Sequence, residues 1–311
     1  MTNLIKSAVL FVGLTATLSN AAQGQSNYTY TTFDFPGAGS NGTVATGIND
    51  AGDVVGYYYD SYVYPHGFLW ANGSMNTVDF PQSKFMTSLF GINNCGTIVG
   101  QIFDNNGATT LQSFVLAGGK YTLVNYPGSV STQALGINDH GMLAGTYQIG
   151  EGDHGFLWYQ GQFTTISGFE QHNAYVSGLN DLGDVVGYYY EGPRSDRNTV
   201  GFAHIKKTNE LLTLSFPGAL NTAATAINNL AQIVGYYRVS NKSNEGAFLY
   251  YYGVYMAIGP FADGAAAWGI NDAGVIAGEL WQPYGGTLGF LATPVGNAPP
   301  TSSGAAACGP Q

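Results

Sequence analysis

The chain has 311 residues, and only 9% of them are charged, with 9 Lys and Arg against 19 Asp and Glu for a formal net charge of -10 at pH 7. An acidic surface that is poor in charge repels phosphate backbones and anionic lipid headgroups. We therefore expect neither nucleic acid nor a membrane surface as a partner.

The N-terminus has the pattern of an export signal. Lys6 precedes a short apolar run from Ala8 to Leu18, and small and polar residues follow through Ala21 and Gly24. This is the pattern of a secretory signal peptide over residues 1–24, with cleavage near its end. The run is too short to span a bilayer, and no other stretch approaches the roughly 20 apolar residues that a transmembrane helix needs. We expect the mature chain to be soluble and extracellular, with the periplasm as the alternative destination.

The rest of the chain is built from one repeated unit. The segment GINDAGDVVG has six copies, which begin at Gly47, Gly91, Gly136, Gly178, Ala226 and Gly269, at spacings of 44, 45, 42, 48 and 43 residues. A phenylalanine that follows a small residue recurs in the same register, at Phe68, Phe114, Phe156, Phe202, Phe248 and Phe290. Stacked repeats share one continuous core, so the sequence predicts a single domain over residues 25–294 rather than two.

Each repeat contains four short strand patterns separated by turn residues. In the first repeat they are Thr43 to Asn49, Asp53 to Tyr59, Gly67 to Trp70, and Met75 to Phe80, which Pro81 ends. We refer to them as strands A, B, C and D. The segments between A and B and between C and D are rich in Asn, Asp and Gly, which favour tight turns. Four strands in 42 to 48 residues is the period of a β-propeller blade.

The fifth repeat departs from this pattern. Ala226 and Ala231 stand where the other copies have glycine. Because alanine adopts positive φ only with strain, we expect the A–B turn of this repeat to be of a different type.

The two ends of the repeat region complete each other. Tyr28 to Pro36 resembles a D strand, yet no A, B or C strand precedes it, and the last repeat ends at Pro294 without a D strand. We therefore expect the N-terminal strand to pair with the last C strand and close a ring, which removes two free sheet edges. The predicted fold is all-β, a six-bladed β-propeller of four-stranded antiparallel blades, followed by a flexible tail over residues 295–311.

Three motifs recur together over Tyr28 to Pro294, namely GIND-x-G-x-VVG, HGF-LW and T-x-DFPG. In this combination the chain resembles the HAF family of bacterial extracellular repeat proteins. The resemblance implies export and a propeller-like repeat array. It implies no catalytic residue set, so none is carried over to this chain.

Loop lengths separate the two faces of the predicted ring. The A–B and C–D connections are tight turns, whereas the B–C and D–A connections vary in length and composition and open on the opposite face, which we call the loop face. Variable loops on a rigid frame are where binding is usually built. Aromatic side chains there stand beside carboxylates and amides, a combination that suits a sugar. The candidate ligand-binding residues are Tyr59, Asp60, Phe103, Asp104, Gln133, Glu170, His172, Tyr190, Glu191, Tyr237, Trp281 and Tyr284.

These candidates leave three functions open. The leading hypothesis is a binding or scaffold module for extracellular carbohydrate. The alternative is a polysaccharide hydrolase or lyase, in which Glu170 and His172 are the first candidates for proton transfer and Asp60, Asp104 and Glu191 are further carboxylates. Two carboxylates about 5 to 9.5 Å apart in a pocket would favour hydrolysis. The third is an envelope or adhesion component with tyrosine-rich contacts, since tyrosine at strand ends is also ordinary sheet composition.

No cofactor or histidine metal site is predicted, although the acidic loop Glu151 to Asp153 has oxygen ligands suited to calcium. Cys95 and Cys308 are the two cysteines, and they either form one disulfide or are unrelated. We expect a monomer.

Overall fold

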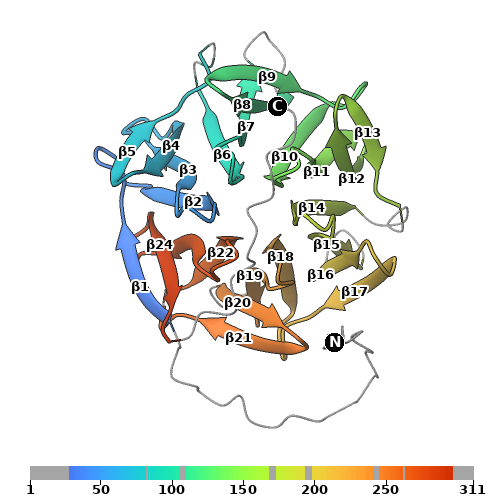
Figure 1. Ribbon diagram of the computed structural model, residues 1–311. Coiled ribbons are helices and arrows are strands. Elements are labelled where there is room, and N and C mark those ends of the chain that lie inside the picture. Colours follow the sequence, from blue (N-terminus) through green and yellow to red (C-terminus); the bar gives the residue numbers. More distant parts are fainter. Residues whose placement is uncertain are drawn as a thin grey trace, which may run out of the picture.

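The computed structural model describes residues 28–81, 83, 85–104, 110–167, 173–192, 198–240, 245–261 and 263–296. Its 24 strands form six four-stranded sheets arranged as blades around a central axis (Figure 1). All strand pairs within these sheets are antiparallel, so the predicted six-bladed β-propeller is confirmed. No helix in the described ranges is long and apolar enough to cross a membrane.

The blades follow the sequence repeats. Blade 1 has β2 (Thr43–Ile48), β3 (Val54–Tyr59), β4 (Pro65–Ala71) and β5 (Ser74–Thr77), and blade 2 has β6 (Thr87–Ile92), β7 (Ile98–Asp104), β8 (Thr110–Ala117) and β9 (Lys120–Val124). Blade 3 has β10 (Ser131–Ile137), β11 (Leu143–Ile149), β12 (Gly152–Tyr159) and β13 (Gln162–Thr165), and blade 4 has β14 (Ala174–Leu179), β15 (Val185–Glu191), β16 (Asn198–Ile205) and β17 (Glu210–Leu214). Blade 5 has β18 (Asn221–Ile227), β19 (Ile233–Arg238), β20 (Gly246–Tyr251) and β21 (Val254–Ile258). Blade 6 has β22 (Ala265–Ile270), β23 (Ile276–Trp281), β24 (Thr287–Pro294) and, as its outer strand, β1 (Tyr28–Phe33).

Strand β1 closes the ring as predicted. It pairs antiparallel with β24, from Tyr28 opposite Pro294 to Phe33 opposite Gly289. Figure 1 shows this first strand, in blue, beside the last strand, in red. The Phe33 ring also packs on Trp70 of blade 1 at a centroid distance of 4.8 Å, so the closing strand seals the seam between blades 6 and 1 as well.

The core repeats once per blade. The six phenylalanines in register, Phe68, Phe114, Phe156, Phe202, Phe248 and Phe290, are completely buried. Each lies opposite the glycine of strand B, as Phe68 lies opposite Gly56. A Cβ on Gly56 would stand 2.0 Å from the Val44 carbonyl oxygen and 2.8 Å from the Phe68 ring. The VVG part of the motif is therefore a packing requirement, since only glycine lets the ring and the neighbouring strand approach this closely.

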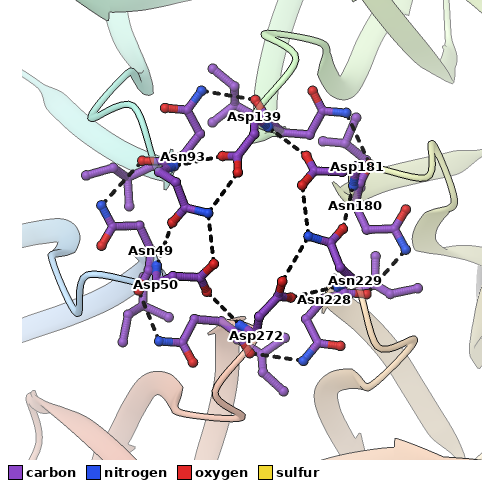
Figure 2. A pocket seen from close by; sticks show the side chains of 18 residues that line it. Asn49, Asp50, Asn93, Asp139, Asn180, Asp181, Asn228, Asn229 and Asp272 are labelled. Carbon is purple, nitrogen blue, oxygen red and sulfur yellow. Dashed lines mark hydrogen bonds between the residues drawn. The ribbon is translucent and has the colours of Figure 1, made fainter. Parts of the chain in front are cut away.

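The first Asn of each A–B turn closes the turn and also ties neighbouring blades together (Figure 2). In blade 1, Asn49 Oδ1 accepts a hydrogen bond from the Asp53 amide within the turn, while Asn49 Nδ2 donates to the Asn93 carbonyl of the next blade. The equivalent hydrogen bond, from the side-chain amide of one Asn to the backbone carbonyl of the Asn in the next blade, is made in turn by Asn93, Asn138, Asn180 and Asn228. In blade 6, Asn271 donates to the Asn49 carbonyl of blade 1. The turns thus form a closed circle of six inter-blade hydrogen bonds.

The next residue of each turn makes a second closed circle nearer the axis. The Asp50 amide donates to Asn94 Oδ1, and the series ends where the Asp272 amide donates to Asp50 Oδ1. The side-chain amides of Asn94 and Asn229 each bridge two carboxylates, as Asn94 does between Asp50 and Asp139. Burial raises the pKa of Asp139, although hydrogen bonds from Asn94 oppose the rise. All of these carboxylates accept hydrogen bonds from neighbouring turns, so the circle has a structural role on this face.

The expectation for the fifth repeat is wrong. Ala231 has φ 59° and its amide donates to the Asn228 carbonyl at 3.1 Å, which matches Gly52 and Asn49 in blade 1. The turn type is therefore unchanged, because the hydrogen bonds of Asn228 to the turn and to blade 6 hold the alanine in the left-handed region.

Two sequence predictions reach beyond the described residues. Residues 1–27 and 297–311, which include the predicted signal peptide and most of the tail, lie outside them. Cys95 is disulfide-bonded, while Cys308, the other cysteine of the chain, also lies outside the described ranges.

Candidate ligand-binding site

A β-bulge in every A strand aims one side chain at the axis. In blade 1 the pairing with strand B skips Thr46, between Ala45 and Gly47, and all six blades repeat the skip. A bulge leaves one residue out of the ladder and re-aims its side chain. The bulged residues are Thr46, Phe90, Leu135, Ser177, Thr225 and Trp268, and together they line an axial recess of about 90 Å³.

The next layer toward the loop face comes from the B strands. The residue after the strand-B glycine lies there in each blade, namely Tyr57, Gln101, Thr146, Tyr188, Tyr236 and Glu279. We call these six residues the mouth. Tyr57 lies against Phe90 with ring centroids 6.4 Å apart, and Tyr236 lies against Trp268 at 5.6 Å. Mouth residues and bulged residues are therefore in contact at two places around the axis.

Glu279 is the buried acid of this surface. It is only 9% exposed, and its Oε1 accepts a hydrogen bond from Trp268 Nε1 at 3.1 Å. Burial raises the pKa of Glu279 from 4.5 to about 7, the Trp268 hydrogen bond opposes this, and the nearby charge of Glu245 adds to it. The carboxyl thus keeps its proton to higher pH than an exposed glutamate does, and it can donate a hydrogen bond when protonated or accept one when ionised.

Further polar groups lie around it. Burial raises the pKa of Glu245, and the Arg238 guanidinium partly offsets the rise. Arg238 Nε and Gln101 Nε2 are both buried without a hydrogen-bond partner among the described residues. An unsatisfied buried donor costs about 1 to 3 kcal/mol. Gln101 is a mouth residue, so a ligand acceptor at this end of the axis would satisfy a donor that the protein leaves open.

The predicted tyrosines at strand ends border the mouth in two blades. Tyr59 contacts Tyr57 edge to face at a centroid distance of 5.6 Å, and Tyr190 contacts Tyr188 in the same way at 5.9 Å. Gln133 lies opposite the mouth residue Thr146 across the first two strands of blade 3. The structure therefore brings Tyr59, Gln133 and Tyr190 near the mouth.

Other predicted residues lie apart from it. Asp60 organises its own loop by accepting hydrogen bonds from the amides of Tyr62 and Tyr64, and the Tyr64 bond holds its pKa below the ordinary value. Its Oδ2 also lies 3.6 Å from Nε2 of His66, whose Nδ1 contacts Asp79 at 2.7 Å. Asp60 is therefore a loop-organising residue.

The remaining predicted residues are spread over the loop face. Tyr237 of blade 5 is stacked on Phe216, in the connection from blade 4, with ring centroids 3.7 Å apart, and Tyr284 is fully exposed at a loop tip. Glu191 is exposed at the end of β15, while Phe103 and Trp281 are half-buried near the ends of β7 and β23. The side chain of Asp104 and the whole of Glu170 and His172 lie outside the described part of the chain. Among the described candidates, Tyr59, Gln133 and Tyr190 lie near the mouth and the others do not.

Sequence reasoning missed the residues that do converge, above all Trp268 and Glu279. One signal was present. The residue before the glycine of GIND and the residue after the glycine of VVG change in chemistry from repeat to repeat while the glycines stay almost constant. Within the described ranges, no group of three or more His, Cys, Asp or Glu is placed to hold a metal ion.

The fold is shared with proteins of very different sequence. TolB from Acinetobacter baumannii superposes with a TM-score of 0.52 at 9% identity, over 78% of this chain and 63% of TolB, so the chain spans less than two thirds of that protein. A mutant Aleuria aurantia lectin in complex with Fucα1-6GlcNAc superposes with a TM-score of 0.50 at 12% identity, over 86% of this chain and 99% of the lectin. No protein-family model and no curated protein matches the sequence. At these identities the likeness shows the β-propeller fold alone.

Proposed function

We propose that the protein is a secreted glycan-binding β-propeller of the HAF type, which binds carbohydrate at the mouth and axial recess on its loop face. Export rests on the signal-peptide pattern of residues 1–24, with the extracellular space or the periplasm as destination. The lectin that shares the fold is in complex with a fucose-containing disaccharide, which supports the ligand class.

The observation that carries the proposal is the arrangement of Trp268, Glu279 and Tyr236. The Trp268 indole has Tyr236 at 5.6 Å and holds the Glu279 carboxyl at 3.1 Å, so a flat apolar surface lies next to a buried group that can donate or accept. A sugar packs the C–H face of its ring on an aromatic ring and needs hydrogen-bond partners for its hydroxyls. The buried Gln101 Nε2 adds a donor without a partner.

The first experiment is a glycan array with the mature chain, followed by calorimetry on the glycans retained. Trp268→Ala should lower the affinity at least tenfold, since one well-placed contact contributes about 1.4 kcal/mol or more. Trp268→Phe keeps a ring but removes the donor to Glu279, and it should have an intermediate effect. Tyr284→Ala, at the exposed loop tip of the same blade, is the matched control and should bind normally.

Two results would contradict the proposal. The first is the absence of any retained glycan. The second is retention that Trp268→Ala leaves unchanged while Tyr284→Ala abolishes it, because binding would then take place at the loop tips.

A polysaccharide hydrolase is the second candidate function, and the acids at the mouth favour it. Burial raises the pKa of both Glu279 and Glu245, and each lies close enough to contribute to the electrostatics of the mouth. A glycosidase needs one protonated and one ionised carboxyl. Release of reducing ends from a bound polysaccharide, lost in Glu279→Gln with binding retained, would establish the hydrolase. Binding without release of reducing ends would leave the lectin function.

A further inference from the structure

A larger cavity lies on the opposite face, between blades 2 and 3, and the proposed glycan site does not include it. Its volume is about 500 Å³. One wall comes from β8 and β9 and the other from β11 and β12. Pockets for small ligands have volumes of roughly 300 to 1,000 Å³, so this cavity has the size of a binding site.

The strand register shows which side chains face each other across the seam. Val115 lies opposite Thr122, and Ala117 lies opposite Lys120, all on the side of blade 2 that faces blade 3. In blade 3, Leu143 lies opposite Trp158. Aliphatic groups and one indole form part of the walls, and Lys120 stands exposed at the rim. The lining also includes polar residues and the disulfide-bonded Cys95.

Small side chains in blade 2 leave this space open. The seam between blades 5 and 6 offers the comparison, because Leu249, Tyr251 and Met256 occupy the places that correspond to Val115, Ala117 and Thr122. Of these larger side chains, Leu249 is 1% exposed and packs with the core of blade 6, whereas Met256 is 40% exposed. The side chains that line the cavity in blade 2 are thus smaller than their counterparts in blade 5.

The polar groups of the cavity favour a ligand that carries a hydrogen-bond acceptor. The Lys120 ammonium and the Trp158 indole N–H have no acceptor or acidic partner in the part of the chain that the structure describes. Asp139, a carboxylate in the lining, already accepts hydrogen bonds from the backbone and side chain of Asn94. Two open donors beside an apolar wall match a molecule with a flat apolar body and one anionic group.

We propose that the cavity between blades 2 and 3 is a second ligand site, which takes a small aromatic carboxylate. The ring system packs on Trp158, Leu143 and Val115, and the carboxylate pairs with Lys120 at the rim. The chain carries a formal charge of -10 and repels anions at long range, so the selectivity for an anion comes from contact with Lys120. This site is independent of the glycan site, since the two open on opposite faces.

Calorimetry on the full mature chain tests the proposal with 1-naphthoate and its neutral analogue 1-naphthalenemethanol. The wild-type protein should bind naphthoate roughly tenfold more tightly than the alcohol, the size of one charge-assisted hydrogen bond. Lys120→Gln should remove that preference. Lys207→Gln, which changes the net charge equally at an exposed position of blade 4, should leave it unchanged.

A second pair of variants locates the site. Ala117→Tyr places in blade 2 the residue that blades 3 and 5 carry at the same position, and it should fill the cavity and weaken naphthoate binding at least tenfold. Ala71→Tyr makes the same change in blade 1 and should have no effect. Thermal unfolding of both variants shows whether the added ring is tolerated, and if Ala117→Tyr is unstable the Lys120→Gln result decides.

The proposal is overturned if naphthoate gives no binding heat at millimolar concentration, or if acid and alcohol bind equally well. It is overturned as well if a folded Ala117→Tyr variant binds naphthoate as tightly as the Ala71→Tyr variant does. None of these results bears on glycan binding at the mouth.

Discussion

Glu279 couples the mouth to pH. Its carboxyl is buried among Tyr57, Tyr59 and Tyr236, with Glu245 nearby and the Trp268 N–H as a hydrogen-bond donor. Burial raises its pKa from 4.5 to about 7, so between these values the folded state holds a proton that the unfolded state has lost. The free energy of unfolding must therefore fall as pH rises from about 4.5 through 7.

Glu279→Gln should remove this pH dependence. The shift corresponds to a loss on the order of 2 to 3 kcal/mol between pH 5 and pH 8 in the wild type, since one pKa unit is about 1.4 kcal/mol. The glutamine variant should be nearly as stable at pH 8 as at pH 5, apart from the contribution of other groups such as Glu245. Urea unfolding at the two pH values measures the difference.

Glu210→Gln is the matched control, because Glu210 is exposed on β17 and far from the mouth. The Glu210→Gln variant should show the same difference in free energy of unfolding between pH 5 and pH 8 as the wild type. Equal pH dependence in Glu279→Gln and the wild type would show that Glu279 titrates as an exposed carboxyl does.

At the scale of single elements, the strands were predictable because every repeat carries the same pattern of strand and turn residues. Turn residues separate runs of β-formers, and the segment YTYTTFDFP, which begins at Tyr28, repeats the D-strand pattern at the wrong end of the chain. The turn role of Asn49 was predictable too, since Asn side chains bond nearby amides. Its second bond, from Nδ2 to the carbonyl of the next blade, was not, because it depends on how closely six turns approach the axis.

The site was predicted only in part, for a reason that also lies in the strands. A bulge adds one residue to a strand, and an alternating pattern cannot show which residue leaves the ladder. Trp268 therefore read as an ordinary strand residue, although the bulge turns it toward the axis. The loops, by contrast, were chosen for their variability, and one such residue, Asp60, proved to be held by the amides of its own loop.

The A–B turns allow a test of backbone strain at matched positions. Ala231 in blade 5 and Gly274 in blade 6 hold the same place, with φ 59° and 76°. A left-handed φ destabilises a residue with a Cβ by about 1 kcal/mol or more. Replacement by glycine removes this strain, but the larger conformational entropy of glycine in the unfolded state offsets roughly half of the gain. Ala231→Gly should therefore stabilise the protein by about 0.5 kcal/mol.

Gly274→Ala should destabilise the protein by about 0.5 to 1 kcal/mol, because alanine adopts the left-handed φ of 76° found at this position only with strain. Denaturant midpoints measure both changes. If the two substitutions change stability in the same direction, then φ strain does not govern these turns.

At the scale of the whole molecule, the ring depends on connections between blades that are far apart in sequence. Two circles of hydrogen bonds join all six A–B turns, and both end on a bond from blade 6 to blade 1. At the outer edge, the pairing of strand β1 with β24 makes a further connection, through which the start of the repeat region completes the last blade. A blade therefore has no complete partner surface until the ring closes, and we expect the six blades to unfold together.

Removal of β1 should open the ring. A chain that begins at residue 34 lacks Phe33, which packs on Trp70, and Tyr30, which packs on Phe261 at 5.3 Å. It also leaves β24 as a free edge, whose unpaired amides and carbonyls can pair with another molecule. Compared with a chain that begins at residue 25, the truncated chain should unfold at lower temperature and form oligomers in light scattering after size exclusion.

A peptide of residues 25–36 should reverse both effects when it is added in excess, because it supplies the missing strand to the exposed edge. The control is a peptide of the same composition in which Tyr28 and Thr29, Tyr30 and Thr31, and Thr32 and Phe33 exchange places. Each of these rings would then lie on the side of the strand opposite to its native one, and the peptide should restore nothing. A truncated chain that stays monomeric and unfolds at the same temperature would mean that the hydrogen-bonded circles at the axis hold the ring closed without its outer strand.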